Sequence, residues 1–142
     1  MTIMYEDKQK TENYGTFLKD KKVLIIEDDT FLGDILTTYL HKNNAIVTLV
    51  TSGENAMEYL KSNVPDILVL DIFLPGINGL DFLENFRKNT LTKKIPVLVL
   101  SNSDQTADKD RAKSLGADFF TKAVVTPNEI INHLYQMLSG VK

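Results

Sequence analysis

The residues with the clearest chemical potential are acidic side chains that directly follow two short apolar runs. Glu27 and Asp28 come after residues 23–26, VLII, and Asp71 comes after residues 67–70, ILVL. If these runs are neighbouring parallel strands, the carboxylates meet at one edge of a sheet and repel one another unless a cation neutralises them. A hard divalent ion, Mg²⁺ or alternatively Mn²⁺, suits oxygen ligands of this kind. We therefore predict a metal site formed by Glu27, Asp28 and Asp71.

Each acid taken singly has a structural alternative, because an Asp after a strand often caps the next helix. For Asp29, which precedes Thr30, we favour this capping role. For the other three acids together we favour a functional role, because further strand ends supply complementary groups rather than random polar residues.

The fourth and fifth apolar runs end in groups that suit phosphate oxygens. Ser101 follows residues 96–100 and offers a hydroxyl, while Lys122 follows residues 117–121 and offers a compact positive charge. A carboxylate such as Asp71 can act as a nucleophile and form an acyl phosphate. A metal and Lys122 would offset the charge of the transferred group, and Ser101 would hydrogen-bond it. Alone, a Ser or Lys here is more often a turn residue or a surface charge, but the combination predicts a phosphoacceptor site at Asp71.

The elements that must position these groups alternate regularly along the chain. Five apolar runs, mostly rich in Val, Ile, Leu or Phe, are typical of buried strands; they span residues 23–26, 45–50, 67–70, 96–100 and 117–121. The stretches between them, and the one that begins at Pro127, predict five helices, of which the fourth runs over about 106–115 and stops at Gly116. Five β-α units predict an α/β fold with a parallel sheet and helices on both faces. Such doubly wound folds bind ligands at the carboxyl ends of their strands.

Composition limits the class of protein. The 142 residues are 43% hydrophobic and 25% charged, with no cysteine and a net charge of −3, which fits one globular domain. The lack of a basic block argues against direct nucleic-acid binding. The absence of a leader pattern and of a long apolar run predicts a cytoplasmic protein without membrane insertion.

The domain organisation expected from these patterns is simple. Residues 1–20 carry mixed charges without sustained periodicity, so we predict a flexible N-terminal extension there. Residues 21–142 form the predicted domain. Because no output module follows the last helix, we expect a stand-alone domain that acts by itself or through partners.

Four segments form a specific pattern when they are taken in order. They are VLIIEDD at 23–29, DILVLDIFLPGINGLDFL at 66–83, VLVLSNS at 97–103 and GADFFTK at 116–122. With these motifs, residues 22–139 resemble the receiver domain of bacterial two-component response regulators. The resemblance implies a flavodoxin-like (βα)5 sandwich with the parallel sheet order 2-1-3-4-5.

The same resemblance implies roles for residues of the acidic site. Asp71 would accept a phosphoryl group from a sensor histidine kinase or a phosphotransfer protein. Glu27 and Asp28 would be the acidic pair, and the backbone carbonyl of Phe73 would complete the metal site. Lys122 would bind the phosphate.

The resemblance also implies a switch. A dianionic group at Asp71 would attract Lys122 and the switch hydroxyl of Ser101, whose movement opens space for the switch aromatic Phe119. For Phe119, plain core packing remains an equal alternative. Repacking would change the face formed by the predicted helix at 106–115, the strand at 117–121 and the helix after Pro127, where a downstream output protein would bind. A monomer or a phosphorylation-promoted homodimer is expected.

Two positions depart from the family pattern. Ala123 follows Lys122 where the family usually has a cis proline, and a cis bond before Ala costs about 2.5–4 kcal/mol. We therefore expect either a trans bond with a reshaped loop at Ala123–Thr126 or a strained bond, both of which affect the reach of Lys122. Asn102 is bulkier than the small residue common after the switch hydroxyl, and we expect it to narrow access to the site.

Three classes of function remain from the sequence. The leading one is a signalling receiver that catalyses only its own phosphorylation and dephosphorylation. An aspartyl-phosphate hydrolase would need a second acid two residues after the nucleophile, where this chain has Phe73. A degenerate receiver, acting as a phosphorylation-independent interaction module, is kept open by Asn102 and Ala123 and opposed by the intact Asp28, Asp71, Ser101 and Lys122.

Overall fold

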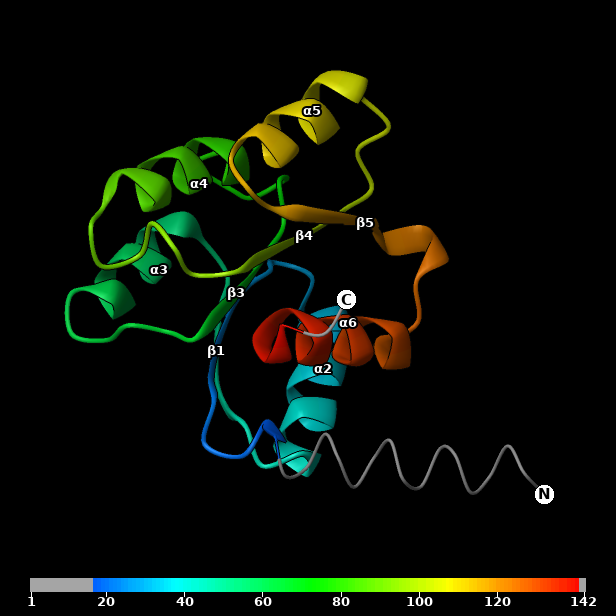
Figure 1. Ribbon diagram of the computed structural model, residues 1–142. Helices are drawn as coiled ribbons and strands as arrows, with labels where there is room; N and C mark the ends of the chain where they lie inside the picture. Colours follow the sequence, from blue (N-terminus) through cyan, green and yellow to red (C-terminus); the bar gives the residue numbers. More distant parts are fainter. Residues whose placement is uncertain (1–16, 141–142) are drawn as a thin grey trace.

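The computed structural model describes residues 17–140 and has five strands in one parallel sheet of order β2-β1-β3-β4-β5 (Figure 1). This confirms the predicted α/β class and strand order. The strands are β1 (Lys22–Ile26), β2 (Ile46–Val50), β3 (Ile67–Leu70), β4 (Val97–Ser101) and β5 (Asp118–Thr121). The helices are α2 (Thr30–Lys42), α3 (Gly53–Leu60), α4 (Gly79–Lys88), α5 (Thr106–Ser114), the 3-10 turn η1 (Lys122–Val124) and α6 (Pro127–Ser139).

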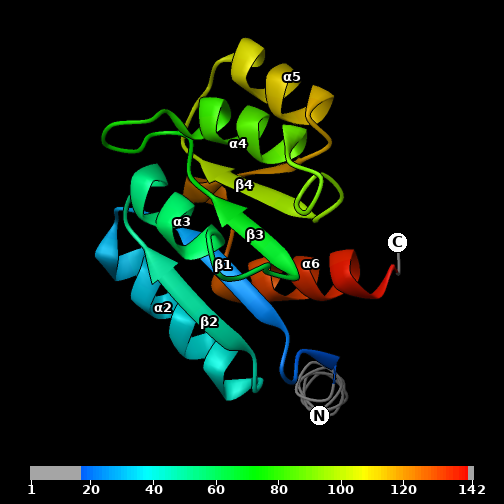
Figure 2. The same cartoon turned by 90° about the vertical axis from the view of Figure 1, so that its left-hand side faces the viewer.

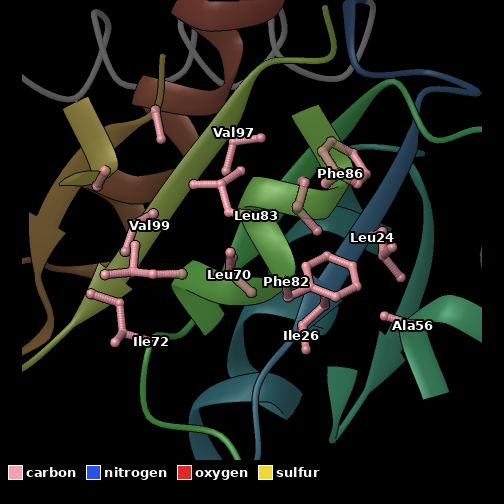
Figure 3. Packing of buried hydrophobic residues seen from close by; sticks show 14 of the residues in the cluster. Leu24, Ile26, Ala56, Leu70, Ile72, Phe82, Leu83, Phe86, Val97 and Val99 are labelled. Carbon is pink, nitrogen blue, oxygen red and sulfur yellow. The ribbon is translucent and has the colours of Figure 1, made fainter. Parts of the chain in front are cut away.

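The sheet is covered on both faces. Helices α3, α4 and α5 lie on one face, and α2 and α6 lie on the other (Figures 1 and 2). Because successive side chains of a strand point to opposite faces, Leu24 and Ile26 pack in the core under α3–α5, whereas Val23 and Ile25 pack in the core under α2 and α6. Figure 3 shows the first of these cores. Two buried faces explain why the strands are continuously apolar rather than alternating.

Side chains cap the N-termini of α2 and α4, which begin near the carboxyl edge of the sheet. Asp29 Oδ1 accepts hydrogen bonds from the backbone N–H groups of Phe31 and Leu32, so its predicted role as a cap is confirmed. Asn78 caps α4 in the same way through the N–H of Leu80. Within the described residues no helix combines the length and the apolar character that crossing a membrane requires.

The described residues just before β1 pack against the domain. Residues 1–16 lie outside the described residues, so the flexible extension stays a prediction. In the remaining part of that segment, Leu18 is fully buried in the core under α2 and α6, and Asp20 donates its N–H to the Asn44 carbonyl (2.9 Å). Leu18 therefore packs as part of the folded domain.

Candidate phosphoacceptor site

The pairing of β1 with β3 brings the predicted acids together. Ile26 is the register partner of Leu70, and the N–H of Asp71 donates to the Ile26 carbonyl (3.0 Å), so the residues that follow both strands leave the sheet side by side. One carboxylate oxygen from each of Glu27, Asp28 and Asp71 lies within 4.8 Å of the others. Glu27 and Asp71 are buried and Asp28 is exposed, so the cluster opens to solvent on the Asp28 side.

Lys122 reaches this cluster from the end of β5. Its Nζ lies 2.7 Å from Asp71 Oδ2 and also forms an ion pair with Glu27 Oε1. The described chain contains no cis peptide bond, so the bond before Ala123 is trans, and the loop is reshaped into the turn η1. Of the two expectations for this loop the trans form holds, and the reach of Lys122 is retained.

Burial and charge act in opposite directions on the ionisable groups. Burial, and to a smaller extent the neighbouring Asp71 carboxyl, raises the pKa of Glu27 from 4.5 to about 7. Lys122 acts to lower the same pKa. Burial by itself would lower the pKa of Lys122, but its hydrogen bonds to Asp71 and Glu27 outweigh that effect and raise it. The lysine is thus firmly held as a cation, whereas the charge of Glu27 is costly.

The donor set fits a hard divalent cation. Glu27 Oε2 is buried and has no hydrogen-bond partner among the described residues, although a buried carboxylate oxygen normally has one. Three carboxylates with one such free oxygen are suitable ligands for Mg²⁺, which accepts oxygen donors and retains several waters. The contribution of the Phe73 carbonyl stays a prediction. The N–H of Phe73 donates to Asp71 Oδ1 (3.1 Å) and orients that carboxylate.

The loop between β3 and α4 is held against the site by close backbone packing. A Cβ at Gly79 would lie 2.1 Å from the Asp71 carbonyl oxygen, so only glycine allows α4 to begin here. Gly76 has a φ of +73°, which L-residues rarely adopt. The neighbouring Ile77 N–H donates to Glu54 Oε1 of α3 (3.2 Å), so α3 supports this loop.

Ser101 lies at the end of β4 and is fully buried. Its Oγ accepts the N–H of Ser103 (3.3 Å), and Ser103 Oγ in turn donates to Asp108 Oδ2 of α5 (2.5 Å). The structure therefore brings Glu27, Asp71 and Lys122 into direct contact, while the hydroxyl of Ser101 is engaged within its own loop.

The sequence did not reveal that the two positions departing from the family pattern are bonded to each other. Asn102 Oδ1 accepts the backbone N–H of Ala123 (3.0 Å) and so links the loop after β4 to the loop after β5. The two residues are 21 positions apart. In the sequence, Asn102 and Ala123 each stand out only as a residue that is unusual for the family. No periodicity or motif indicates that they contact each other.

The two aromatic residues of β5 point to opposite faces of the sheet. Phe119 is half-buried against the core under α3–α5, with Lys109 Nζ 5.8 Å from its ring centroid. Phe120 packs on the other core and against the ring of His133. A switching role for Phe119 stays a prediction.

Comparisons with known proteins show which family this chain resembles. Residues 23–135 match the family model described as the response regulator receiver domain. The response regulator SaeR of Staphylococcus aureus is 33% identical over 120 residues, which are 84% of this chain and 51% of that protein. The chain thus spans about half the length of the curated relatives it matches.

Solved structures give the same result for the fold. The beryllium trifluoride-activated N-terminal receiver domain of RstA from Klebsiella pneumoniae is 27% identical with a TM-score of 0.74, over 83% of this chain and 98% of that chain. The chemotaxis response regulator CheY4 of Vibrio cholerae is 21% identical with a TM-score of 0.77, over 84% of this chain and 100% of that chain. The second likeness concerns the fold alone.

Proposed function

The chain belongs to the response regulator receiver domain family, and from this membership we propose that Asp71 is the phosphoacceptor of a Mg²⁺-dependent two-component signalling step. The observation that carries the proposal is the convergence of three carboxylates and one lysine at one sheet edge. Lys122 Nζ contacts both Asp71 and Glu27, and Asp28 lies beside them at the solvent side. A single acid at a strand end would support no such proposal.

In the proposed reaction, a carboxylate oxygen of Asp71 forms a bond to phosphorus while the bond from phosphorus to the donor breaks. The donor is the phosphohistidine of a sensor kinase or phosphotransfer protein, and its nitrogen leaves with the electron pair of the broken bond. Nothing is oxidised or reduced. The Phe73 N–H holds Asp71 Oδ1 and the Lys122 ammonium holds Oδ2, so the nucleophile is oriented before the donor arrives.

Glu27, Asp28 and Asp71 would hold the metal, with the Phe73 carbonyl as a further ligand. Bound there, Mg²⁺ supplies positive charge that stabilises the transferred phosphoryl oxygens. Lys122 supplies a second positive charge from the side of β5. Ser101 accepts the Ser103 N–H, which leaves its own hydroxyl hydrogen available, and it would donate this hydrogen to the phosphoryl group.

Exposed apolar side chains support a protein as the phosphodonor. Phe31 and Val124 are each 75% exposed and Phe73 is 56% exposed. The three residues follow β1, β5 and β3, the same strands that deliver the acids and the lysine. Apolar groups around a charged centre are typical of a surface that another protein covers. The output partner would bind the face of α5, β5 and α6, after Phe119 repacks.

The test is the intact mass of the protein after incubation with acetyl phosphate and Mg²⁺. Wild type should gain one labile phosphoryl group, and Asp71→Asn should gain none. The matched control is Asp29→Asn, which changes a neighbouring acid but keeps an Asn cap on α2. It should be phosphorylated like wild type.

A phosphoryl adduct that persists in folded Asp71→Asn would contradict the assignment of the acceptor. If wild type gains no adduct and binds no beryllium trifluoride, the degenerate receiver is favoured, a module that binds its partner without phosphorylation.

A further inference from the structure

The hydrogen bond between Asn102 and Ala123 joins the two loops that carry the phosphate-binding groups. Asn102 directly follows Ser101, and Ala123 directly follows Lys122. The Asn102 Oδ1 to Ala123 N distance is 3.0 Å. The bond therefore lies one residue away from the hydroxyl on one side and from the ammonium group on the other.

We propose that Asn102 is a positioning residue for Lys122: by holding the Ala123 N–H it fixes the loop that directs the lysine to Asp71 and Glu27. This placement of Lys122 does not depend on phosphorylation. Its consequence for phosphoryl binding rests on the proposed function.

Apart from the ion pairs of Lys122 and the partly buried Val125, which packs against the core under α2 and α6, few described contacts hold this loop in place. The turn η1 has only three residues, and no side chain caps its N-terminus. Ala123 and Val124 are exposed, and Val124 is 75% exposed, so burial of apolar surface contributes little there. Besides the ion pairs of the Lys122 side chain with Asp71 and Glu27, the Asn102 bond is thus a specific long-range polar contact of the segment's backbone, linking it to a residue 21 positions earlier.

Asn102 and Ala123, the two residues that depart from the family pattern, supply the acceptor and the donor of one hydrogen bond. A proline at position 123 would have a fixed φ and no N–H, so it could not donate a hydrogen bond to Asn102. Alanine leaves φ free and adds a donor, and the Asn102 side chain supplies an acceptor for it. The contact replaces a covalent restraint on the loop with a hydrogen bond.

Because Asn102 and Ala123 are both exposed, water can substitute for the lost partner when the bond is removed. The net stabilisation from such a bond is small, about 1 kcal/mol. Asn102→Ala should therefore leave the fold intact and alter chiefly the placement of Lys122. An intact fold with a displaced Lys122 would show that Asn102 positions the lysine rather than stabilises the fold.

The first experiment uses NMR on the whole protein without metal or phosphodonor. In Asn102→Ala, amide exchange at Ala123 should become severalfold faster, and the ¹⁵N resonance of Lys122 Nζ should move toward that of a free lysine. Asn102→Asp keeps Oδ1 and should retain the slow exchange. An unchanged Ala123 amide or an unchanged Lys122 resonance in Asn102→Ala would overturn the proposal.

The second experiment measures the affinity for beryllium trifluoride in the presence of Mg²⁺. Asn102→Ala should weaken binding severalfold when Lys122 is present, and should have no further effect in a Lys122→Ala background. An equal loss in both backgrounds would show that Asn102 acts by another route. If wild type does not bind the probe at all, the proposed function fails, while the NMR measurement still decides the role of Asn102.

Discussion

Lys122 Nζ lies 2.7 Å from Asp71 Oδ2, although the two residues are 51 positions apart in the chain. The contact exists because β3 and β5 both end at the same edge of the sheet, with β4 between them. The same ammonium group also pairs with Glu27. One cation thus compensates two buried carboxylates, and in the absence of metal the packing of this edge depends on it.

Lys122→Ala should destabilise the metal-free protein, because Glu27 and Asp71 then remain buried without a counter-charge. We expect a loss of about 3 kcal/mol in the free energy of unfolding at pH 8, and less with Mg²⁺ present. Urea denaturation measures both values. The control is Lys61→Ala, which removes an exposed ion pair with Glu58 and should cost less than about 0.5 kcal/mol. Equal losses in the two variants would refute a structural role for the Lys122 contacts.

Asp28→Asn should weaken Mg²⁺ binding about tenfold or more and leave the fold intact. Asp28 is the exposed member of the acidic cluster, so its substitution removes a charged ligand without disturbing the core. Titration of Mg²⁺ by calorimetry gives the affinity, and thermal unfolding checks the fold. Asp34→Asn, an exposed acid in α2, serves as the control. An unchanged Mg²⁺ affinity in Asp28→Asn would remove Asp28 from the metal site.

Mg²⁺ affinity should rise with pH between 6 and 8. Burial and the Asp71 carboxyl raise the pKa of Glu27 to about 7, and a protonated carboxyl is a poor ligand. At pH 6 most Glu27 is protonated, so binding should be about tenfold weaker than at pH 8. Glu27→Gln should bind more weakly at both values and lose most of this dependence. A flat profile in wild type would show that Glu27 is not a ligand.

The same pKa shift predicts how the stability of the metal-free protein depends on pH. Between its usual pKa of 4.5 and about 7, the folded state binds more protons at Glu27 than the unfolded chain does. The contribution of Glu27 is therefore complete below about 4.5 and is lost as pH rises through about 7. Denaturation at several pH values should show this slope in wild type and not in Glu27→Gln.

The sequence predicted the sheet and the acidic cluster because both depend on local patterns. Runs of buried apolar residues indicate strands, and acids directly after two such runs are placed by parallel pairing alone. Two strands, β2 and β5, start one residue later than predicted for a physical reason. The N–H groups of Ala45 and Ala117 close the preceding helices by donating to Leu40 and Ala112, so neither residue joins the sheet ladder.

Other features could not be predicted because they depend on tertiary placement. Leu18 follows Phe17 in an otherwise polar stretch and forms no periodic pattern, yet it is fully buried. The bond between Asn102 and Ala123 requires two loops whose conformations no motif specifies. The raised pKa of Glu27 follows from how deeply it is buried, which its position after β1 does not determine.

Gly79→Ala should destabilise the domain by about 2–3 kcal/mol, because the added Cβ would lie 2.1 Å from the Asp71 carbonyl oxygen and 2.7 Å from Ile72 Cα. Backbone atoms of a central strand end cannot yield as a flexible side chain can, so α4 must shift away from Asp71. Phosphorylation by acetyl phosphate should also slow, since the carboxylate moves with its backbone. The control is Gly33→Ala, whose Cβ would have the flexible side chain of Leu49, and no backbone atom, as its nearest contact. Helix propensity favours alanine there, so its unfolding free energy should change little. If Gly79→Ala were as stable as Gly33→Ala, the close approach of α4 to the phosphoacceptor would not be a constraint on this fold.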